Sequence, residues 1–509
     1  MSSYDWEEMM KRDEPVIEPE FETFLKECVP ELPPTDIVNE VTPWKNAMNR
    51  ILWGMALTTI TFKFWNLDYL LPMIGMFLML FGFRTLREEN KWFKLCWYLM
   101  IPRITYFEFR CIFDATIYRS ILADSNMSLG LIVVNFLIVF IQIICFWKAI
   151  RTVQEKTGLP PRAKAAIVLF GWYVVMCYLG AMQYTGVLAY VLLIGYVCII
   201  RSLWNLSKEL TEAGYAIKPA QIIVSERKIV TGALLILAVG MSCGYLFFHS
   251  YPMDWQPAMI SEDEKRQEIE QHLIKLGFPE TVLADLSEED ILACDGALRV
   301  VVEANNHSVG EGRVVREETV IGYSEHTVYD REELQFIHIG VELPGERERW
   351  KIFHHFKFIY NPGFYGTESI QLWSCYRINP EAWGPEGEVT GQVLYDEDGQ
   401  TNIASYASLA SERYQADTIF WGVSDNTDVF ADFSMPNRGE NHRGYLSYVT
   451  VEMQDGWILD SWVNYSHQNS WLQYPVLTAK EKRKLDNLAN MEPFKTIQDA
   501  LQFYPNEEG

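Results

Sequence analysis

The sequence lacks the short motifs that mark many known catalytic centres. It contains no HExxH, no GxSxG, no GxxxxGK[ST] and no GxGxxG, so it gives no indication of a zincin, an α/β-hydrolase, a P-loop or a dinucleotide site. All nine histidines lie at or beyond His249, which leaves no histidine ligand or proton carrier before that point. We therefore expect no metal site and no cofactor, and the lack of catalytic motifs favours a protein that is not an enzyme.

Positive charge is also scarce. The chain has 43 Lys and Arg against 67 Asp and Glu, a formal net charge of -24. Because such a surface repels phosphate groups, nucleic acid is not an expected partner.

Cysteine is scarce after the apolar region, where only Cys294 and Cys375 occur. One disulfide between them is an open alternative to two free thiols.

The N-terminal 46 residues lack hydrophobic content. They carry 12 acidic against 4 basic residues and no positively charged start followed by an apolar stretch. This composition predicts an acidic, solvated tail over residues 1–46 and no cleavable signal peptide.

Long uncharged runs dominate the region that follows, residues 47–249. Residues 128–147, 165–182 and 229–248 hold no charged side chain, and shorter apolar runs cover 51–83 and 186–200. About 20 apolar residues cross a hydrocarbon core of ~30 Å. The sequence therefore predicts a multi-pass helical bundle whose partner is the lipid bilayer, in a plasma membrane.

The number of crossings depends on residues 92–109, which are apolar but contain Lys94, Arg103 and Glu108. The loops after Trp147 and after Ile200 are rich in Lys and Arg, whereas about fifteen residues after Phe248 have neither. Since basic loops stay in the cytoplasm, this pattern predicts a cytoplasmic N-terminus and an extracytoplasmic C-terminal domain. For these loops to lie on the cytoplasmic side, residues 92–109 must cross the membrane, which gives seven spans. If that segment lies flat on the membrane, the number of spans is six.

Four polar side chains are candidates for a role inside the membrane. Arg103 and Glu108 lie on the uncertain segment, and Asn135 and Gln142 are seven residues apart on one helix face. Ionisable groups in a bilayer are costly and often functional, whereas amides usually bond a neighbouring helix. Arg103 and Glu108 keep a transporter open as an alternative function.

The remainder reads as a soluble, mainly β domain, of the sandwich or jelly-roll type, with flanking helices. Residues 250–297 form a short helical linker region in this interpretation, with Ser287 and Asp290 at the start of one helix. Residues 298–475 hold short β-branched and aromatic runs broken by turn residues, which predict strands. One hairpin is expected across Gln454, Asp455 and Gly456, and a helical tail over 476–509.

Tryptophans crowd this domain, and their rings serve either as core or as a platform for a sugar. The candidate ligand-binding residues are Trp373, Trp383, Trp421, Trp457 and Trp462.

Other possible sites in the domain are weaker. His354 and His355 are adjacent on a predicted strand and so point to opposite faces. The stretch around Asp396 and Asp398 resembles part of a calcium loop but lacks the terminal Glu, which favours a surface turn.

The passages LDYLLPMIGMFLMLFGFRTLREENKWFK and GFPETVLADLSEEDILACDGALRVVV resemble uncharacterised multi-pass membrane proteins of clostridial-type (Firmicutes) bacteria. The resemblance implies a bacterial plasma membrane and no particular chemistry. We expect a non-enzymatic envelope protein whose external β-rich domain binds an envelope glycan, a peptide or a protein partner. Besides the transporter, the alternative is a membrane-anchored envelope hydrolase that uses carboxylates among Glu368, Asp425, Asp428 and Asp432.

Overall fold

The computed structural model divides the chain into two compact units, which are described separately. The first comprises residues 1–111 and 126–237, and the second residues 112–125 and 238–509. The structure describes residues 43–505 except 62–65, 120–125, 161–162, 183, 185, 213–216, 218–219, 222, 259–262, 311, 320–321, 329–330, 419–421 and 486–492. The predicted acidic tail therefore lies outside the described residues up to 42, and residues 43–46 belong to the first helix.

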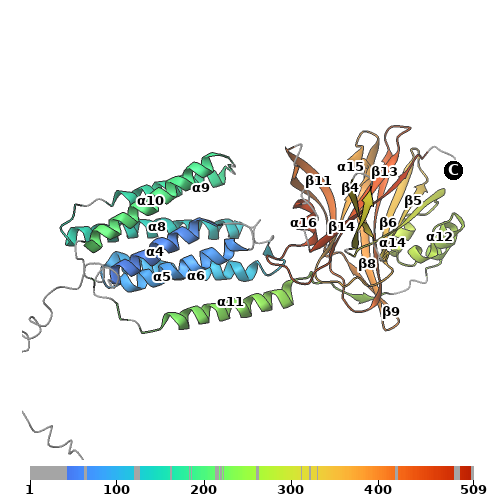
Figure 1. The fold of residues 1–509 in the computed structure, drawn as a ribbon. Helices are drawn as coiled ribbons and strands as arrows, with labels where there is room; N and C mark the ends of the chain where they lie inside the picture. Colours follow the sequence, from blue (N-terminus) through green and yellow to red (C-terminus); the bar gives the residue numbers. More distant parts are fainter. Residues whose placement is uncertain are drawn as a thin grey trace, which may run out of the picture. The chain divides into compact units, whose positions relative to one another are not determined.

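Long helices build the first unit (Figure 1). They are α4 (Pro43–Thr59), α5 (Leu67–Leu86), α6 (Lys91–Phe113), α8 (Asn126–Lys156), α9 (Lys164–Ala181), α10 (Leu188–Glu212) and α11 (Glu226–Phe248), the ends of α6 and α11 being grouped with the second unit. Among the described residues, five helices are long and apolar enough to cross a membrane: α5, α8, α9, α10 and α11. The predicted helical region is confirmed with five candidate spans.

Small residues allow α4 and α5 to pack closely. A Cβ added to Gly54 would lie 2.5 Å from the carbonyl oxygen of Gly75, and one added to Gly75 would lie 2.7 Å from that of Gly54. Seven residues after Gly75, a Cβ added to Gly82 would lie 2.7 Å from the carbonyl oxygen of Ala47. Close backbone approach on small residues is the usual means of helix association in membranes, where burial of apolar surface gives little driving force.

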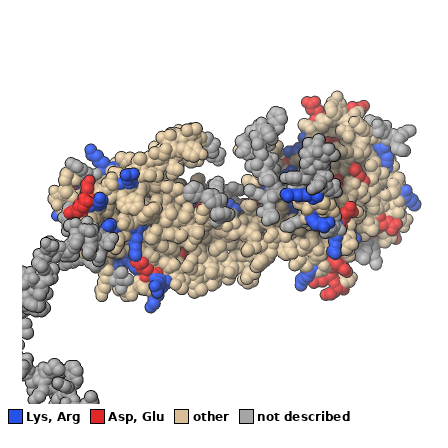
Figure 2. All heavy atoms as spheres, in the orientation of Figure 1, with Lys and Arg blue, Asp and Glu red and all other residues tan. Residues whose placement is uncertain are grey.

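Aliphatic side chains cover the outside of this bundle. Leu129 is 63% exposed, Ile194 65% and Leu235 63%. On the visible face, charged side chains gather at one end of the helical unit and leave a broad uncharged surface (Figure 2). An exposed apolar surface of this extent would aggregate in water, so it suits a protein surrounded by lipid.

The second unit is a sandwich of two antiparallel sheets. The larger sheet has the order β1-β9-β8-β12-β6-β5-β2, the smaller β10-β11-β7-β13-β14, and β3 and β4 form a separate pair. The strands of the larger sheet are β1 (Gln256–Pro257), β2 (Arg299–His307), β5 (Leu334–Leu343), β6 (Arg349–Phe358), β8 (Trp383–Glu397), β9 (Gln400–Ser405) and β12 (Glu440–Glu452). The others are β3 (Arg313–Thr319), β4 (Gly322–Val328), β7 (Glu368–Trp373), β10 (Ser408–Thr418), β11 (Gly422–Phe433), β13 (Leu459–Gln468) and β14 (Phe494–Phe503). The predicted sandwich-like β domain is confirmed.

Both faces of the larger sheet are covered. One face packs on the smaller sheet through residues such as Trp350, Phe356 and Leu446. The other face packs against α12 (Glu264–Lys275), α13 (Glu280–Leu283) and α14 (Glu288–Leu292). The short helices predicted within 250–297 are present, and their apolar faces form a layer on the sheet.

The predicted hairpin across Gln454, Asp455 and Gly456 is wrong. β12 and β13 are strands, but β12 pairs with β6 and β8 in one sheet, whereas β13 pairs with β7 and β14 in the other. The connection at 453–458 thus passes between sheets and is no hairpin turn. Of the described residues after 476, Ala479–Leu485 form α16 and Phe494–Phe503 form β14 beside β13, so the predicted helical tail is helical only in part.

Candidate functional site

The outer face of the smaller sheet carries both polar and aromatic side chains. Ile370 and Leu372 of β7 point into the sandwich core, so Ser369, Gln371 and Trp373 point the other way because strand side chains alternate. Trp462 of β13 is directly paired with Trp373 of β7, which places both rings on the outer face.

These two tryptophans line an open hollow of about 590 Å³. The helix α15 (Cys375–Ile378) follows β7 directly and contributes Arg377. The other residues of the lining are Ile378, Asp425, Asn426, Thr427 and Asp460. Aromatic faces, two carboxylates, an amide and a guanidinium thus converge on one surface, which is the usual composition of a polar ligand site.

Hydrogen bonds fix the two rings. The indole N–H of Trp462 donates to Asp460 Oδ1, which also accepts from Gln502 Nε2 at 2.8 Å. The indole N–H of Trp373 donates to Asp428 Oδ2 at 3.3 Å, and the Arg377 guanidinium lies 5.2 Å from the Trp373 ring centroid. Because their orientation is set without a ligand, binding costs little side-chain entropy.

Asp428 does not line the hollow but holds two residues that do, Trp373 and Arg377. It accepts hydrogen bonds from Gln371 Nε2 at 2.5 Å and from the Tyr414 hydroxyl at 2.6 Å, and it forms an ion pair with Arg377. Burial and the neighbouring Asp428 carboxylate raise the pKa of Tyr414, which keeps the phenol protonated as a donor. With several donors committed to it, Asp428 acts as a positioning group.

Helix α16 covers the next part of the same face. Lys480 pairs with Asp432 and, at 2.9 Å, with Glu412. Ser369 Oγ donates to Asp432 Oδ1 at 2.8 Å, and burial raises the pKa of the Asp432 carboxyl even though Lys480 opposes the shift. This ion-pair network fastens the C-terminal helix to the sheet and bounds the hollow on that side.

A second polar cluster lies under the helical layer, on the other side of the larger sheet. Asp290 of α14 is 1% exposed. It accepts hydrogen bonds from Lys351 Nζ at 2.8 Å, Thr390 Oγ1 at 2.7 Å, Ser447 Oγ at 2.9 Å and Tyr445 OH at 2.6 Å. Burial alone would raise the pKa of Asp290, but Lys351 and the hydroxyl donors outweigh it and lower the value to about 2. Such saturation marks a structural ion pair.

A chain of Ser, His and Asp side chains crosses the core between the sheets. Ser461 Oγ lies 2.8 Å from His354 Nε2, and His354 Nδ1 lies 2.8 Å from His338 Nδ1. His338 Nε2 is 3.4 Å from Asp499 Oδ2. This order resembles a nucleophile with its base, but Ser461 and His338 are 0% exposed and His354 2%. A substrate cannot reach a nucleophile enclosed in the core, so the chain fastens the sheets together.

The five candidate tryptophans fall in different places. Trp373 and Trp462 share the hollow. Trp383 is 1% exposed in the core and donates to the Ile458 carbonyl oxygen at 3.0 Å, so its assignment to a ligand site is wrong. Trp457 is 42% exposed on the connection between β12 and β13 and is not part of the hollow. Trp421 lies outside the described residues.

The four candidate carboxylates do not share one surface. Glu368 faces the core, where it contacts His467 Nδ1 at 2.9 Å. Asp428 and Asp432 lie on the outer face, and Asp425 is exposed at 3.1 Å from Arg413. Since Asp428 and Asp432 are held by Arg377 and Lys480, the set offers no acid and base pair across an open cleft. The hydrolase alternative therefore loses its geometric support.

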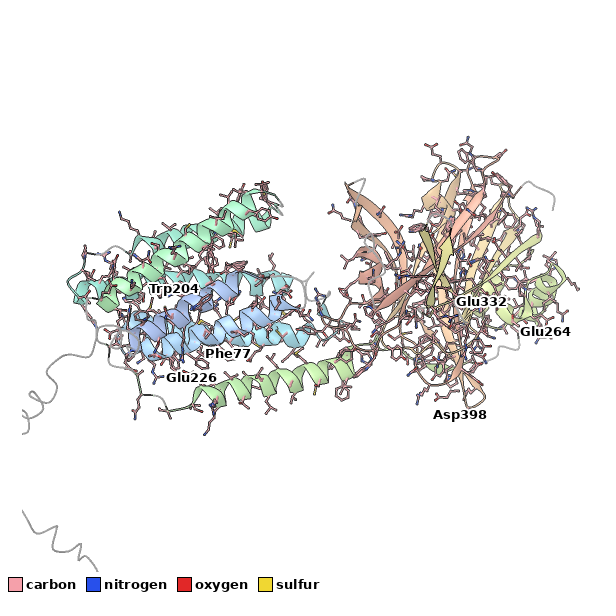
Figure 3. All side chains as sticks on the ribbon, in the orientation of Figure 1. Phe77, Trp204, Glu226, Glu264, Glu332 and Asp398 are labelled. Atoms are coloured by element: carbon pink, nitrogen blue, oxygen red, sulfur yellow. The ribbon has the colours of Figure 1, made fainter. Side chains whose placement is uncertain are left out.

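Other sequence predictions in this unit have clear outcomes. His354 points into the core and His355 toward Asp285 under the helical layer, 2.9 Å away, as alternation requires. Asp398 and Gly399 have φ values of 53° and 77° and join β8 to β9 as a two-residue turn at the tip labelled in Figure 3. The surface-turn interpretation is confirmed, since such a pair of positive φ angles fits a type I′ hairpin.

Cys294 and Cys375 are both free and buried, in different hydrophobic clusters. Among the described residues, no group of three or more His, Cys, Asp or Glu side chains is placed to hold a metal ion.

In the helical unit, the structure brings two of the four polar candidates together. Arg103 of α6 donates to Gln142 Oε1 of α8 at 2.5 Å, and Gln142 Nε2 lies 3.0 Å from Met100 Sδ. Glu108 and Asn135 are partly exposed on α6 and α8. The spacing in the sequence placed Gln142 on one face of its helix. It did not indicate that Gln142 would accept a hydrogen bond from Arg103.

The fold thus defines a helical membrane-type region joined to a β-sandwich with a polar hollow on one outer face. No protein-family model and no curated protein sequence matches the chain. One similar solved structure is TmCBM27, a carbohydrate-binding module described in a study of mannan recognition. It has 10% sequence identity, a TM-score of 0.14, and coverage of 31% of this chain and 90% of that chain. A TM-score this low does not indicate a shared fold.

Proposed function

We propose that this is a multi-pass envelope protein whose β-sandwich binds a glycan at the Trp373–Trp462 hollow. The observation that carries the proposal is the direct pairing of two partly exposed tryptophans beside Arg377, Asp425 and Asp460. These residues come from different strands and from α15, so the chain brings them together only when folded.

The chemistry of the hollow favours a hydroxyl-rich, uncharged ligand. Sugar rings present C–H faces that pack on flat aromatic side chains, together with hydroxyl groups that both donate and accept hydrogen bonds. Carboxylates at Asp425 and Asp460 accept, whereas Asn426 and Arg377 donate. A strongly anionic ligand would meet the two aspartates, and a purely apolar ligand would cover polar side chains without hydrogen-bonding to them.

The topology that accompanies this function uses all seven long helices. α4 is 17 residues long and α6 carries charged residues, so neither is among the five candidate spans. Local thinning of the bilayer accommodates a short helix at small cost, and the Arg103–Gln142 hydrogen bond gives α6 a polar partner inside the bundle. With seven crossings and basic loops in the cytoplasm, the sandwich faces the extracytoplasmic side.

Calorimetric titration of the full chain in detergent with a panel of neutral oligosaccharides tests the proposal. We expect at least one of these to bind, and Trp462→Ala to weaken that binding about tenfold or more because a stacking platform is lost. Trp457→Ala is the matched control, since Trp457 is exposed outside the hollow. Binding by none of the sugars, or equal effects of both substitutions, would overturn the proposal.

A transporter is the second candidate, favoured by one observation. Arg103 lies within α6 and bonds Gln142 of α8, and ionisable groups at membrane depth commonly serve transport. Substrate flux into vesicles that survives Arg103→Gln unchanged would rule out this role for the arginine.

A further inference from the structure

A hollow in the helical unit lies between α4 and α10, far along the sequence from the β-sandwich. It has a volume of about 320 Å³. Lys45 and Asn49 of α4 and Trp204, Ser207 and Lys208 of α10 contribute to its lining. Trp204 is marked on α10 in Figure 3. The hollow therefore combines two ammonium groups with an aromatic ring and short polar side chains.

The position of the hollow along the helices corresponds to the edge of the hydrocarbon region. On α10 the uninterrupted apolar sequence ends at Ile200, and the lining residues begin one turn later at Trp204. On α4 the apolar sequence begins at Ile51, two residues after the lining residue Asn49 and directly after Arg50. Two helices thus change from polar to apolar at the same place, which is where headgroups meet a membrane protein.

The aromatic part of the hollow is fixed in place. Trp204 donates its indole N–H to Asn49 Oδ1 at 2.6 Å and packs edge-on against Trp53 at a centroid distance of 5.3 Å. Trp53 is itself 52% exposed. Tryptophans in this arrangement favour the interface, where one end of the ring is apolar and the other is wet.

The charges of the hollow favour an anion. Lys45 and Lys208 both contribute to its lining, which also contains one acidic residue, Glu212, 3.6 Å from Lys208. Both members of that pair are largely exposed, and exposed i,i+4 pairs are weak and easily exchanged for a better partner. A phosphate group offers more oxygen acceptors to the two ammonium groups than one carboxylate does.

From these observations we propose that the hollow between α4 and α10 binds the headgroup of an anionic phospholipid. The phosphate lies between Lys45 and Lys208, and the acyl chains run along the apolar surface that begins at Trp53 and continues on α10, where Val197 is 51% exposed. Basic pockets between membrane helices on the side of the basic loops commonly hold such headgroups. The inference rests on the helical unit lying in a bilayer and is independent of glycan binding.

Native mass spectrometry of the full chain in detergent tests the site with two lipids of identical acyl chains, phosphatidylglycerol and phosphatidylcholine. We expect retention of phosphatidylglycerol over phosphatidylcholine, and about a tenfold loss of that preference in Lys45→Gln/Lys208→Gln. Lys91→Gln/Lys94→Gln on α6 is the matched control, because it removes the same charge outside the hollow. The thermal unfolding midpoint of each variant shows that the bundle remains folded.

Three results would overturn the proposal. These are an unchanged preference in Lys45→Gln/Lys208→Gln, an equal loss in the control, which would show general charge attraction, and complete displacement of the lipid by inorganic phosphate, which would show a free-anion site. If the double variant does not fold, Trp204→Phe replaces it. That variant keeps both lysines and an aromatic ring but loses the hydrogen bond to Asn49, and we expect a two- to threefold weaker preference.

Discussion

The two polar clusters of the β-sandwich unit differ in how their polar atoms are used. Asp290 lies at the centre of one cluster, 1% exposed, with Lys351 and hydroxyl donors around its oxygens. In the other, Trp373 and Trp462 border an open hollow in which Asp425 is exposed. The first cluster is enclosed within the fold, whereas the second is open to solvent, where we propose that it binds a glycan.

This difference separates structural charges from functional ones. A buried ion pair contributes through specificity and is very costly to break, but it offers nothing to a ligand. A preorganised surface contributes little to folding, yet it binds a partner at low entropic cost. Substitutions in the two clusters should therefore affect different measurements.

The largest effect is expected when one member of the buried pair is removed. Lys351→Met leaves the Asp290 carboxylate without its cation and should lower the free energy of unfolding of the β unit by about 3–5 kcal/mol. Hydrogen exchange of the β6 and β12 amides measures the change. Lys357→Met, on the same strand and the same face but partly exposed, should change stability by less than about 0.5 kcal/mol.

Acidification should act next on the core between the sheets. Burial lowers the pKa of His354 below the ordinary value of 6.5, and the facing His338 lowers it further, although Asp499 opposes the shift. The unfolded chain therefore binds an extra proton at this residue below pH 6.5, so His354 alone should lower the free energy of unfolding by up to about 1.4 kcal/mol per pH unit. Urea unfolding between pH 7 and 5 measures this slope, and a flat profile would contradict it.

Asp290 should affect the free energy of unfolding at lower pH than His354 does. Its pKa falls from 3.8 to about 2 on folding, so its stabilisation is complete above pH 3.8 and is lost as pH falls toward 2. In Asp290→Asn the added loss of stability below pH 3.8 should disappear, while the slope between pH 7 and 5 should remain. Persistence of the low-pH loss would show that another group causes it.

A smaller effect is expected from a change within the hollow that keeps its shape. Trp462→Phe retains an aromatic face but loses the hydrogen bond to Asp460. Glycan affinity should fall about three- to tenfold, less than for Trp462→Ala, while the unfolding midpoint stays close to that of the native chain. Loss of stability equal to that of Lys351→Met would place Trp462 among the structural residues.

The smallest effect is expected at the rim. Asp425 is exposed and its partner Arg413 lies 3.1 Å away, also exposed. Asp425→Asn should change glycan affinity about two- to threefold and leave stability unchanged, because an exposed ion pair contributes little. Calorimetry against the same sugar checks both expectations.

Sequence reasoning found what depends on local pattern. Apolar length located the membrane helices, Ser287 and Asp290 correctly indicated the start of α14, where Ser287 Oγ accepts from the Asp290 N–H, and a two-residue turn was recognised at Asp398. Alternation identified β12 and β13 but could not tell that they join different sheets, because a strand pattern does not name its partner. β14 was missed because its sequence was assigned to a helical tail.

The candidate site was found only in part for the same reason. Tryptophan content indicated an aromatic surface, but it did not show that Trp383 is buried in the core whereas Trp462 lies on the outer face of the smaller sheet. The pairing of Trp462 with Trp373 joins positions 89 residues apart by number, as the register shows, and no local pattern encodes it. The single signal available in the sequence was the alternation of Trp462 with core residues such as Val463.

Hydroxyl-radical footprinting of the tryptophans in the full chain, with and without the sugar that binds, tests the central claim most directly. We predict that the ligand protects Trp373 and Trp462 from oxidation and leaves Trp457, which is 42% exposed outside the hollow, as reactive as before. Unchanged reactivity of Trp373 and Trp462 in the presence of saturating sugar would contradict the account.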